Sequence, residues 1–450
     1  MSGMPLAQAL LLAASRCILV IATRSRRLHP FIAIVLVASA FALAAGFSVG
    51  FLGKAFGVGF SKAMYSPGLV IVAAGFIAAL AESTGASDQF AAKIERWRSL
   101  GPTRIATLLG LIAGIAASPA AAFALLTPLI RPIGGATARK RAAAATALAL
   151  AISASHGVVL LAPVPIAAGA ILDAAWGRVA LFGLPIALLL AAVGAVWAQW
   201  IASFGTASQG SVLESDHPSE KRSGGSAVVL LLAILIPLLM QMVQSIGDIP
   251  SEPFGGGPSR ERIIGVGRPL ILFLVGVGIM AIGRWRQSRK LLLDSSWSER
   301  VLGDVAGIVM IVGAAGGLQR LCQETGMAEL LGERLLAWPA GLLVPFLVAA
   351  VIKSVQGSSL VAAIAAAGMV QPLLTPLGIG DETGKALATL AVGAGAMTVS
   401  HVNDEYFWLV AAGAGLSPLR AVVAVTAGTL LQGLAAVAAL LLLSLLTHHL

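Results

Sequence analysis

Two ionisable side chains and an amide lie close together beyond a long apolar run: His401, Asp404 and Asn403. Burying an ionisable group unpaired in a membrane is costly, so such a residue marks a functional site by default. Because histidine can titrate near neutral pH, we expect His401 or Asp404 to exchange a proton and Asn403 to hydrogen-bond a substrate. A structural role is the alternative, since Asn403 or Asp404 can also N-cap the helix that follows.

A second polar group separates two other apolar runs. Gly357, Ser358 and Ser359 form this connection and offer hydroxyls and open backbone amides to an oxyanion. A plain hairpin turn is the alternative. Lys353 precedes the connection and is expected either to neutralise a substrate carboxylate or to pair with Asp404, whereas a snorkelling lysine would only reach the membrane surface.

The first half of the chain has weaker candidates in corresponding places. Ser118 precedes Pro119 where two apolar runs meet, and Ser155 and His156 end another such run. We expect Ser118 and Ser155 to contribute to substrate binding and His156 to be a further proton-exchanging group. A histidine bonded to a facing carbonyl would explain His156 equally well.

The recurrence of a serine–histidine pair indicates a duplicated chain. The pair that ends at His156 recurs at His401, 245 positions later. The segment AAAFALLTPL (120–129) likewise returns as IAAAGMVQPL (364–373). A doubled unit in an apolar chain is the usual sign of a secondary transporter, with its site between the halves.

The composition places the chain in a lipid bilayer. Of its 450 residues, 58% are hydrophobic and 11% charged, whereas a soluble domain has about 25% charged residues. The net charge of +10 comes from short basic loops, which the positive-inside rule explains without nucleic acid. Cys17 and Cys322 lack metal-ligand spacing, so we expect no disulfide, metal or cofactor.

Basic clusters orient the predicted spans, because cytoplasmic loops carry an excess of lysine and arginine. The clusters lie at 24–27, 93–98, 139–141, 221–222 and 284–290. Their placement predicts that 102–130 is a re-entrant hairpin entering from the cytoplasm and that 339–374 enters from outside. Irregular backbone at membrane depth requires burial or a cavity, so the facing breaks of the two hairpins are a candidate binding site.

We therefore predict an all-α polytopic membrane protein of two inverted repeats, 1–203 and 226–450, joined by a cytoplasmic linker at 204–225. About ten transmembrane helices should accompany the two re-entrant hairpins. Two further helices should be broken, around 155–165 and around 400–405, because polar residues and prolines interrupt their apolar runs.

Two strings, GSSLVAAIAAAGMVQPLL (357–374) and VSHVNDEYFWLV (399–410), resemble the gluconate permease (Gnt) family. The matching residues are Gly357, Ser358, His401, Val402, Asn403, Asp404, Phe407 and Trp408. The resemblance covers most of 30–447 and implies an ion-transporter-type fold with paired hairpins. It also implies proton-coupled uptake of gluconate or a related small organic anion through the bacterial inner membrane.

The first half departs from the family pattern. The segment SPAAAF (118–123) has no carboxylate where the family tends to carry one, and LAPVPIAAG (161–169) has no histidine. We therefore expect proton coupling to depend on the second half, at His401 and Asp404.

Three other functions stay open on the sequence alone. A sodium-coupled organic-anion transporter would keep the same fold and use open carbonyls at the hairpin ends. An intramembrane enzyme would use His401 and Asp404 on a lipid-linked substrate, but nucleotide, zinc-protease and serine-hydrolase motifs are absent, so we expect a transporter. A channel is the third alternative function. The sequence does not determine the oligomeric state and leaves a homo-oligomer open.

Overall fold

The computed structural model is helical, with no strand among the residues that it describes. These residues are 4–24, 28–116, 118–135, 137–203, 225–247 and 255–447. The all-α prediction is therefore confirmed. Of the predicted linker, only Gly225 is described, so the prediction for 204–224 lies outside the described residues.

Within the described residues, ten α-helices precede the linker. They are α1 (Met4–Arg24), α2 (Pro30–Ala44), α3 (Val49–Ala63), α4 (Leu69–Thr84), α5 (Ala86–Ile94), α6 (Gly101–Ala116), α7 (Pro119–Gly134), α8 (Ala138–Val158), α9 (Pro163–Ile171) and α10 (Trp176–Ser203). A π-helical segment, η1 (Met64–Gly68), joins α3 to α4, and a 3-10 helix, η2 (Glu95–Leu100), precedes α6.

The remaining helices follow the linker. They are α11 (Ala227–Gly247), α12 (Gly257–Gly265), α13 (Pro269–Gly283), α14 (Trp285–Leu292), α15 (Ser295–Glu324), α16 (Met327–Leu336), α17 (Leu343–Gln356), α18 (Ser359–Val370), η3 (Gln371–Leu373), α19 (Glu382–Gly395), α20 (Glu405–Gly413), α21 (Pro418–Ala421), η4 (Val422–Thr426) and α22 (Ala427–Thr447).

Six segments of the described chain are long and apolar enough to cross a membrane, or eight if two bent helix pairs each form one span. Five shorter apolar helices accompany them, so the count of about ten crossings stays a prediction. In α10 and the segment ending with α22, only 39% and 28% of the most apolar window is buried within the protein. The apolar side chains left exposed there form a surface suited to lipid tails.

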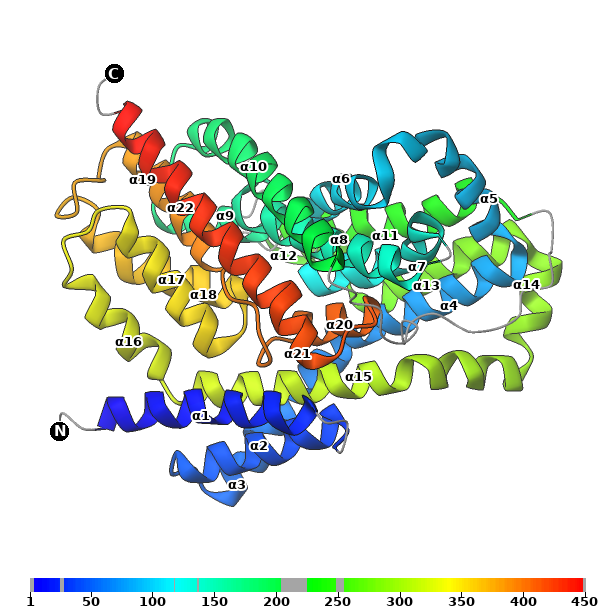
Figure 1. The fold of residues 1–450 in the computed structure, drawn as a ribbon, viewed down its shortest axis with the longest axis horizontal. Coiled ribbons are helices and arrows are strands. Elements are labelled where there is room, and N and C mark those ends of the chain that lie inside the picture. The colour runs from blue at the N-terminus through cyan, green and yellow to red at the C-terminus, as the bar shows by residue number, and fades with distance from the viewer. Residues whose placement is uncertain are drawn as a thin grey trace.

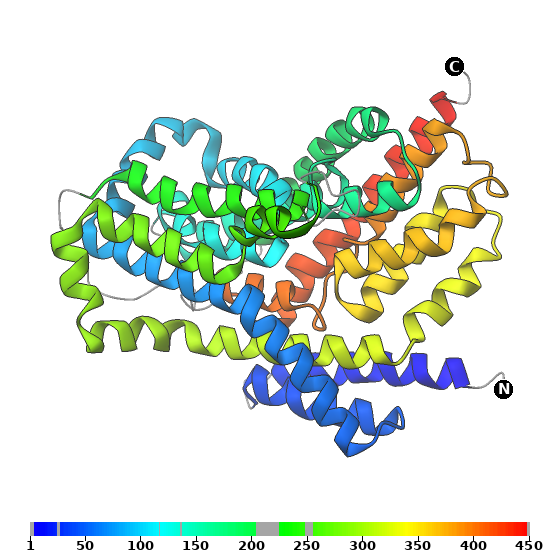
Figure 2. The same ribbon diagram turned by 180° about the vertical axis from the view of Figure 1, so that it is seen from behind.

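The order of elements in the first half recurs in the second. A long helix, α4 or α15, is followed by a glycine in the left-handed conformation, Gly85 or Gly326, and then by a short helix. A two-helix hairpin, an interrupted helix and a long final helix come next. Figures 1 and 2 show the hairpins α6–α7 and α17–α18 on opposite sides of the molecule's centre. The division into two repeats and their inversion across the membrane remain predictions.

The first helix predicted to be broken is interrupted within the predicted range, around 155–165, but beyond His156. Helix α8 continues through His156 to Val158, and irregular backbone occupies 159–162 before α9 begins at Pro163. Proline suits the first position of a helix because the N–H that it lacks would have no partner there. His156 therefore lies in the last turn of a helix rather than in unwound backbone.

The second interruption is longer than predicted. Helix α19 already ends at Gly395, and α20 begins only at Glu405. Within the gap, Val399 has a φ of 59°, an unfavourable conformation for a β-branched residue that the surrounding packing must hold in place. The predicted break around 400–405 is thus the second part of a stretch that starts at 396.

The two interrupted helices cross at a glycine contact. A Cβ atom on Gly393 of α19 would lie 2.0 Å from the carbonyl oxygen of Gly157 on α8, so the backbones can approach this closely only with glycine. Small residues are enriched at such contacts in membrane proteins because close packing drives helix association there. The crossing brings the two interruptions into one region of the protein.

Candidate functional site

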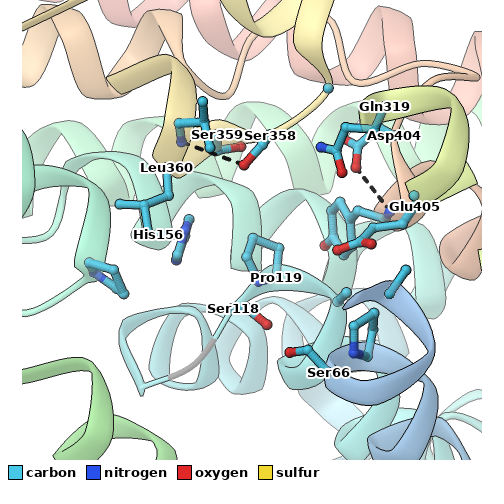
Figure 3. A pocket seen from close by; sticks show the side chains of 18 of the residues that line it. Ser66, Ser118, Pro119, His156, Gln319, Ser358, Ser359, Leu360, Asp404 and Glu405 are labelled. Atoms are coloured by element: carbon cyan, nitrogen blue, oxygen red, sulfur yellow. Dashed lines mark hydrogen bonds between the residues drawn. The ribbon is translucent and has the colours of Figure 1, made fainter. Parts of the chain in front are cut away.

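A cavity of about 550 Å³ lies where the hairpin ends and the interruptions meet. Its walls come from both halves of the chain. Besides the hairpin ends and the interrupted helices, α3, α11 and α15 contribute to them. Figure 3 shows side chains from both hairpin ends, from α8 and from the start of α20 around this space. Seven of the ten predicted site residues line it: Ser118, His156, Lys353, Gly357, Ser358, Ser359 and Asp404.

The first turns of α7 and α18 both line the cavity. Ser118 caps α7 by accepting a hydrogen bond from the N–H of Ala121 (3.4 Å), and Ser358 caps α18 by accepting one from the N–H of Val361 (3.5 Å). The first N–H groups of a helix have no intrahelical partner, and the helix dipole favours negative charge near them. Two such ends at one cavity form an arrangement suited to an anion.

The second half adds a buried ion pair at the same place. Lys353 Nζ lies 2.6 Å from Asp404 Oδ2, and both side chains are almost fully buried. Ser400 Oγ donates to the same carboxylate oxygen at 2.6 Å, while Asp404 Oδ1 accepts the N–H of Tyr406 at 2.9 Å. Asp404 therefore pairs with the lysine and N-caps α20 at the same time.

Donors from distant segments hold the C-terminal end of α17. Asn403 Nδ2 donates to the carbonyl oxygens of Ser354 and Val355, each at 3.1 Å, and Arg16 of α1 donates to the Val355 oxygen at 3.0 Å. The last carbonyls of a helix lack intrahelical partners and carry partial negative charge. Asn403 and Arg16 satisfy these groups, which also explains an arginine within the apolar helix α1.

Gly357 is required by the geometry of this hairpin end. Its φ is +81°, and a Cβ atom there would lie 2.7 Å from the carbonyl oxygen of Asn403. Lys353 also donates a hydrogen bond to the carbonyl oxygen of Gly357. Any side chain at this position would therefore push the α17–α18 connection away from the interruption before α20.

Three predicted site residues do not line the cavity. Asn403 is 1% exposed, and its amide is committed to the end of α17. Ser155 is fully buried and donates to backbone carbonyls of α6 and α8, which positions one helix against the other. His401 is half-buried, and the charged groups that act on it are Arg16 and Lys353. A proton on His401 would therefore add a third positive charge to this region.

Three charged residues of the cavity, Lys62, Arg320 and Glu405, were not singled out by the sequence. Glu405 lies in the first turn of α20, and Lys62 lies in the last turn of α3. An ionisable residue in an apolar segment is itself a signal, and Glu405 directly follows Asp404. Lys62 lies just before the π-helical η1, an irregularity that is frequent at functional sites but has no sequence pattern of its own here.

These observations define a class of protein. Several apolar spans with lipid-suited surfaces make the chain a multi-pass membrane protein. A polar cavity at interrupted helices is the arrangement of secondary transporters. Within the described ranges, no group of three or more His, Cys, Asp or Glu residues could hold a metal ion.

The chain belongs to the GntP family of permeases, whose profile matches residues 7–446. It is 31% identical to a gluconate permease of Pseudomonas aeruginosa over 409 aligned residues, and this alignment covers 87% of each chain. It is also 26% identical to a gluconate permease of Zymomonas mobilis over 424 aligned residues, and this alignment covers 88% of each chain. The crystal structure of the YdaH transporter from Alcanivorax borkumensis aligns with 92% of this chain and 96% of its own, at a TM-score of 0.41 and 16% identity.

Membership of this family confirms the resemblance read from the sequence. The relatives are permeases, which makes this chain a transporter rather than an enzyme. It is a multi-pass protein of the bacterial inner membrane, as the sequence predicted.

Proposed function

We propose that this protein takes up gluconate or a related sugar acid through the inner membrane and couples the uptake to protons. The names of its relatives support the substrate class. The observation that carries the proposal is the pair of helix N-termini, α7 and α18, at one cavity. Helix N-termini bind carboxylates through their unpaired N–H groups and the positive end of the dipole.

The remaining walls suit the hydroxyl groups of a sugar acid. Uncharged polar side chains lie on η1, α11 and α15: Ser66, Gln241, Gln244, Ser245, Gln319 and Gln323. Hydroxyl and amide groups both donate and accept hydrogen bonds, as a polyhydroxylated chain requires. A dicarboxylate would instead need a second anion-binding group for its other end.

The proton is proposed to bind in the second half, because the first hairpin end carries no carboxylate. Of the three groups expected from the sequence, Asp404 is already compensated by Lys353, and His401 does not line the cavity. His156 does line it. Coupling at Asp404 would require the proton to displace a buried ion pair, which makes a different carboxylate of the same wall the better candidate.

Uptake into sealed liposomes tests the proposed function. With purified protein in the membrane and an inside-alkaline pH gradient, labelled gluconate should accumulate above its outside concentration. Replacing sodium by choline should leave this accumulation unchanged, and liposomes without protein serve as the control. Accumulation that requires sodium would favour sodium coupling, and equilibration without accumulation would favour a channel.

A further inference from the structure

Glu405 differs from its neighbour Asp404 in how its side chain is held. The Glu405 side chain is half-buried and lines the cavity. Among the described residues, none forms a hydrogen bond or an ion pair with its carboxylate, whereas Asp404 is held by Lys353 and Ser400. Figure 3 shows Glu405 on the same side of the space as Gln319, with Pro119 and Ser118 to its lower left. A carboxylate placed in this way is free to exchange a proton with the cavity.

Lys62 is the complementary cation. It comes from α3, is exposed to the cavity, and has no hydrogen-bond or ion-pair partner among the described residues. Its charge attracts that of Glu405, although the two side chains form no ion pair. The lysine ammonium carries three donors and no acceptor, which suits a carboxylate ligand.

The other charged groups of the wall are paired. Lys353 is paired with Asp404, and Arg320 with Glu324 of the same helix. Of the charged side chains that line the cavity within the described chain, this leaves Lys62 and Glu405. Their charges are opposite, so the empty cavity has no net charge when Glu405 is ionised and His156 is neutral.

We propose that Glu405 binds the transported proton and that Lys62 binds the carboxylate of the sugar acid. This inference rests on the proposed function and names the two groups that carry it out. In this proposal the proton comes from the aqueous phase and binds a carboxylate oxygen of Glu405. No covalent bond to the substrate forms or breaks.

Charge balance then couples the two ligands. A sugar-acid anion alone would give the cavity a net charge of minus one, and a proton on Glu405 returns it to zero. Net charge at membrane depth is costly, so the empty cavity and the cavity with both ligands are the two states that can change sides. One proton therefore accompanies each monovalent anion.

Gluconate binding measured by calorimetry in detergent tests the assignment. For the wild-type protein, affinity should fall by up to about tenfold per pH unit on the alkaline side, because binding is linked to uptake of one proton. Glu405→Gln mimics the protonated side chain, so its affinity should be high and independent of pH. The same variant in liposomes should exchange labelled gluconate but fail to concentrate it under a pH gradient.

Matched controls separate this role from a general loss of structure. Glu382→Gln changes an exposed carboxylate at the start of α19 that pairs with Arg178, so it should keep the pH dependence and the accumulation. Lys62→Met should lower gluconate affinity at least about tenfold, since a charge-assisted hydrogen bond contributes this much. Lys54→Met, on the same helix but outside the cavity wall, should not.

The outcomes also separate this inference from the function on which it rests. If the wild-type protein neither binds nor transports gluconate, the proposed function is wrong and the inference falls with it. If the wild-type protein binds gluconate with the expected pH dependence and Glu405→Gln keeps that dependence, only the assignment of Glu405 is wrong. Unchanged affinity in Lys62→Met would overturn the assignment of the anion.

Discussion

The two hairpin ends that meet at the cavity are held by different forces. Around Ser118, the first turns of α7 consist of Pro119, buried alanines and Phe123, and this stretch itself carries no charged residue. Around Ser358, the end of α17 is held by the buried Lys353–Asp404 pair and by hydrogen bonds from Asn403. The same order of helices therefore supports an apolar wall in one half and a charged network in the other.

This difference indicates where the chemistry of transport resides. Apolar packing does not respond to a proton or an anion, whereas a network of charges does. The first hairpin end can contribute its helix N-terminus to the anion, while the second can also sense charge. Three comparisons between the halves, from the largest expected effect to the smallest, test this contrast, and a fourth tests the orientation of the hairpins.

Removing the cation of the buried pair should have the largest effect. In Lys353→Met the Asp404 carboxylate stays buried without its partner, which typically lowers the free energy of unfolding by about 3–5 kcal/mol. The melting temperature in detergent measures this loss. The first half supplies the control, because the Arg131–Glu82 pair lies at 2.9 Å with Arg131 47% exposed, and Arg131→Met should cost at most about 1 kcal/mol. Similar losses in the two variants would contradict the contrast.

Asn403→Ala should have an intermediate effect. The variant loses two hydrogen bonds to α17 carbonyls, each worth about 0.5–1.5 kcal/mol. Gluconate affinity should fall as well, because the α17–α18 connection loses the hydrogen bonds that hold it at the cavity. Ser155→Ala in the first half removes a hydroxyl that bonds mainly to carbonyls already used within α8, so its melting temperature should change less. An unchanged melting temperature and an unchanged gluconate affinity in Asn403→Ala would show that these hydrogen bonds contribute nothing to the site.

The two helix caps should have small and similar effects on stability. Ser118→Ala and Ser358→Ala should each lower the free energy of unfolding by about 1 kcal/mol, the usual contribution of an N-cap. Both should weaken gluconate binding if the two N-termini hold the anion together. Ser48→Ala removes the cap of α3, which accepts the N–H of Phe51 at 3.2 Å outside the cavity wall, and it should lose stability without losing affinity. Wild-type affinity in both cavity variants would place the anion elsewhere.

The orientation of the hairpins is tested by labelling and involves no energy difference. In a background with Cys17→Ser, a cysteine in place of Thr137 should react with an impermeant reagent only from the cytoplasmic side. A cysteine in place of Pro376 should react only from outside. Both positions are exposed in the structure. Reaction of both from one face would remove the argument for inverted halves.

Local sequence signals predicted the parts of the site that depend on neighbouring residues. Ser118 before Pro119, and Gly357 before Ser358, mark the ends of helices in the structure as they did in the sequence. The pairing of Lys353 with Asp404 was one of three interpretations of that lysine, because both residues lay at expected breaks of the apolar pattern.

Contacts between distant segments could not be read from the pattern. Nothing local indicates that Asn403 and Arg16 would share the carbonyl of Val355, so the structural contact of Asn403 could not be predicted, and its contact with substrate stays a prediction. His156 was expected in unwound backbone, but α8 continues past it because a helix satisfies its own N–H and C=O groups at membrane depth. The sequence did not single out Lys62, because the role proposed for it depends on lining the same cavity as Glu405, a residue of a distant segment.

The structure of the protein with bound gluconate, determined by electron cryo-microscopy at acidic pH, tests the central claim most directly. The account predicts density for gluconate in the cavity between the first turns of α7 and α18, with its carboxylate against Lys62. Density outside this cavity, or in it with the carboxylate facing away from both helix N-termini and from Lys62, would contradict the account.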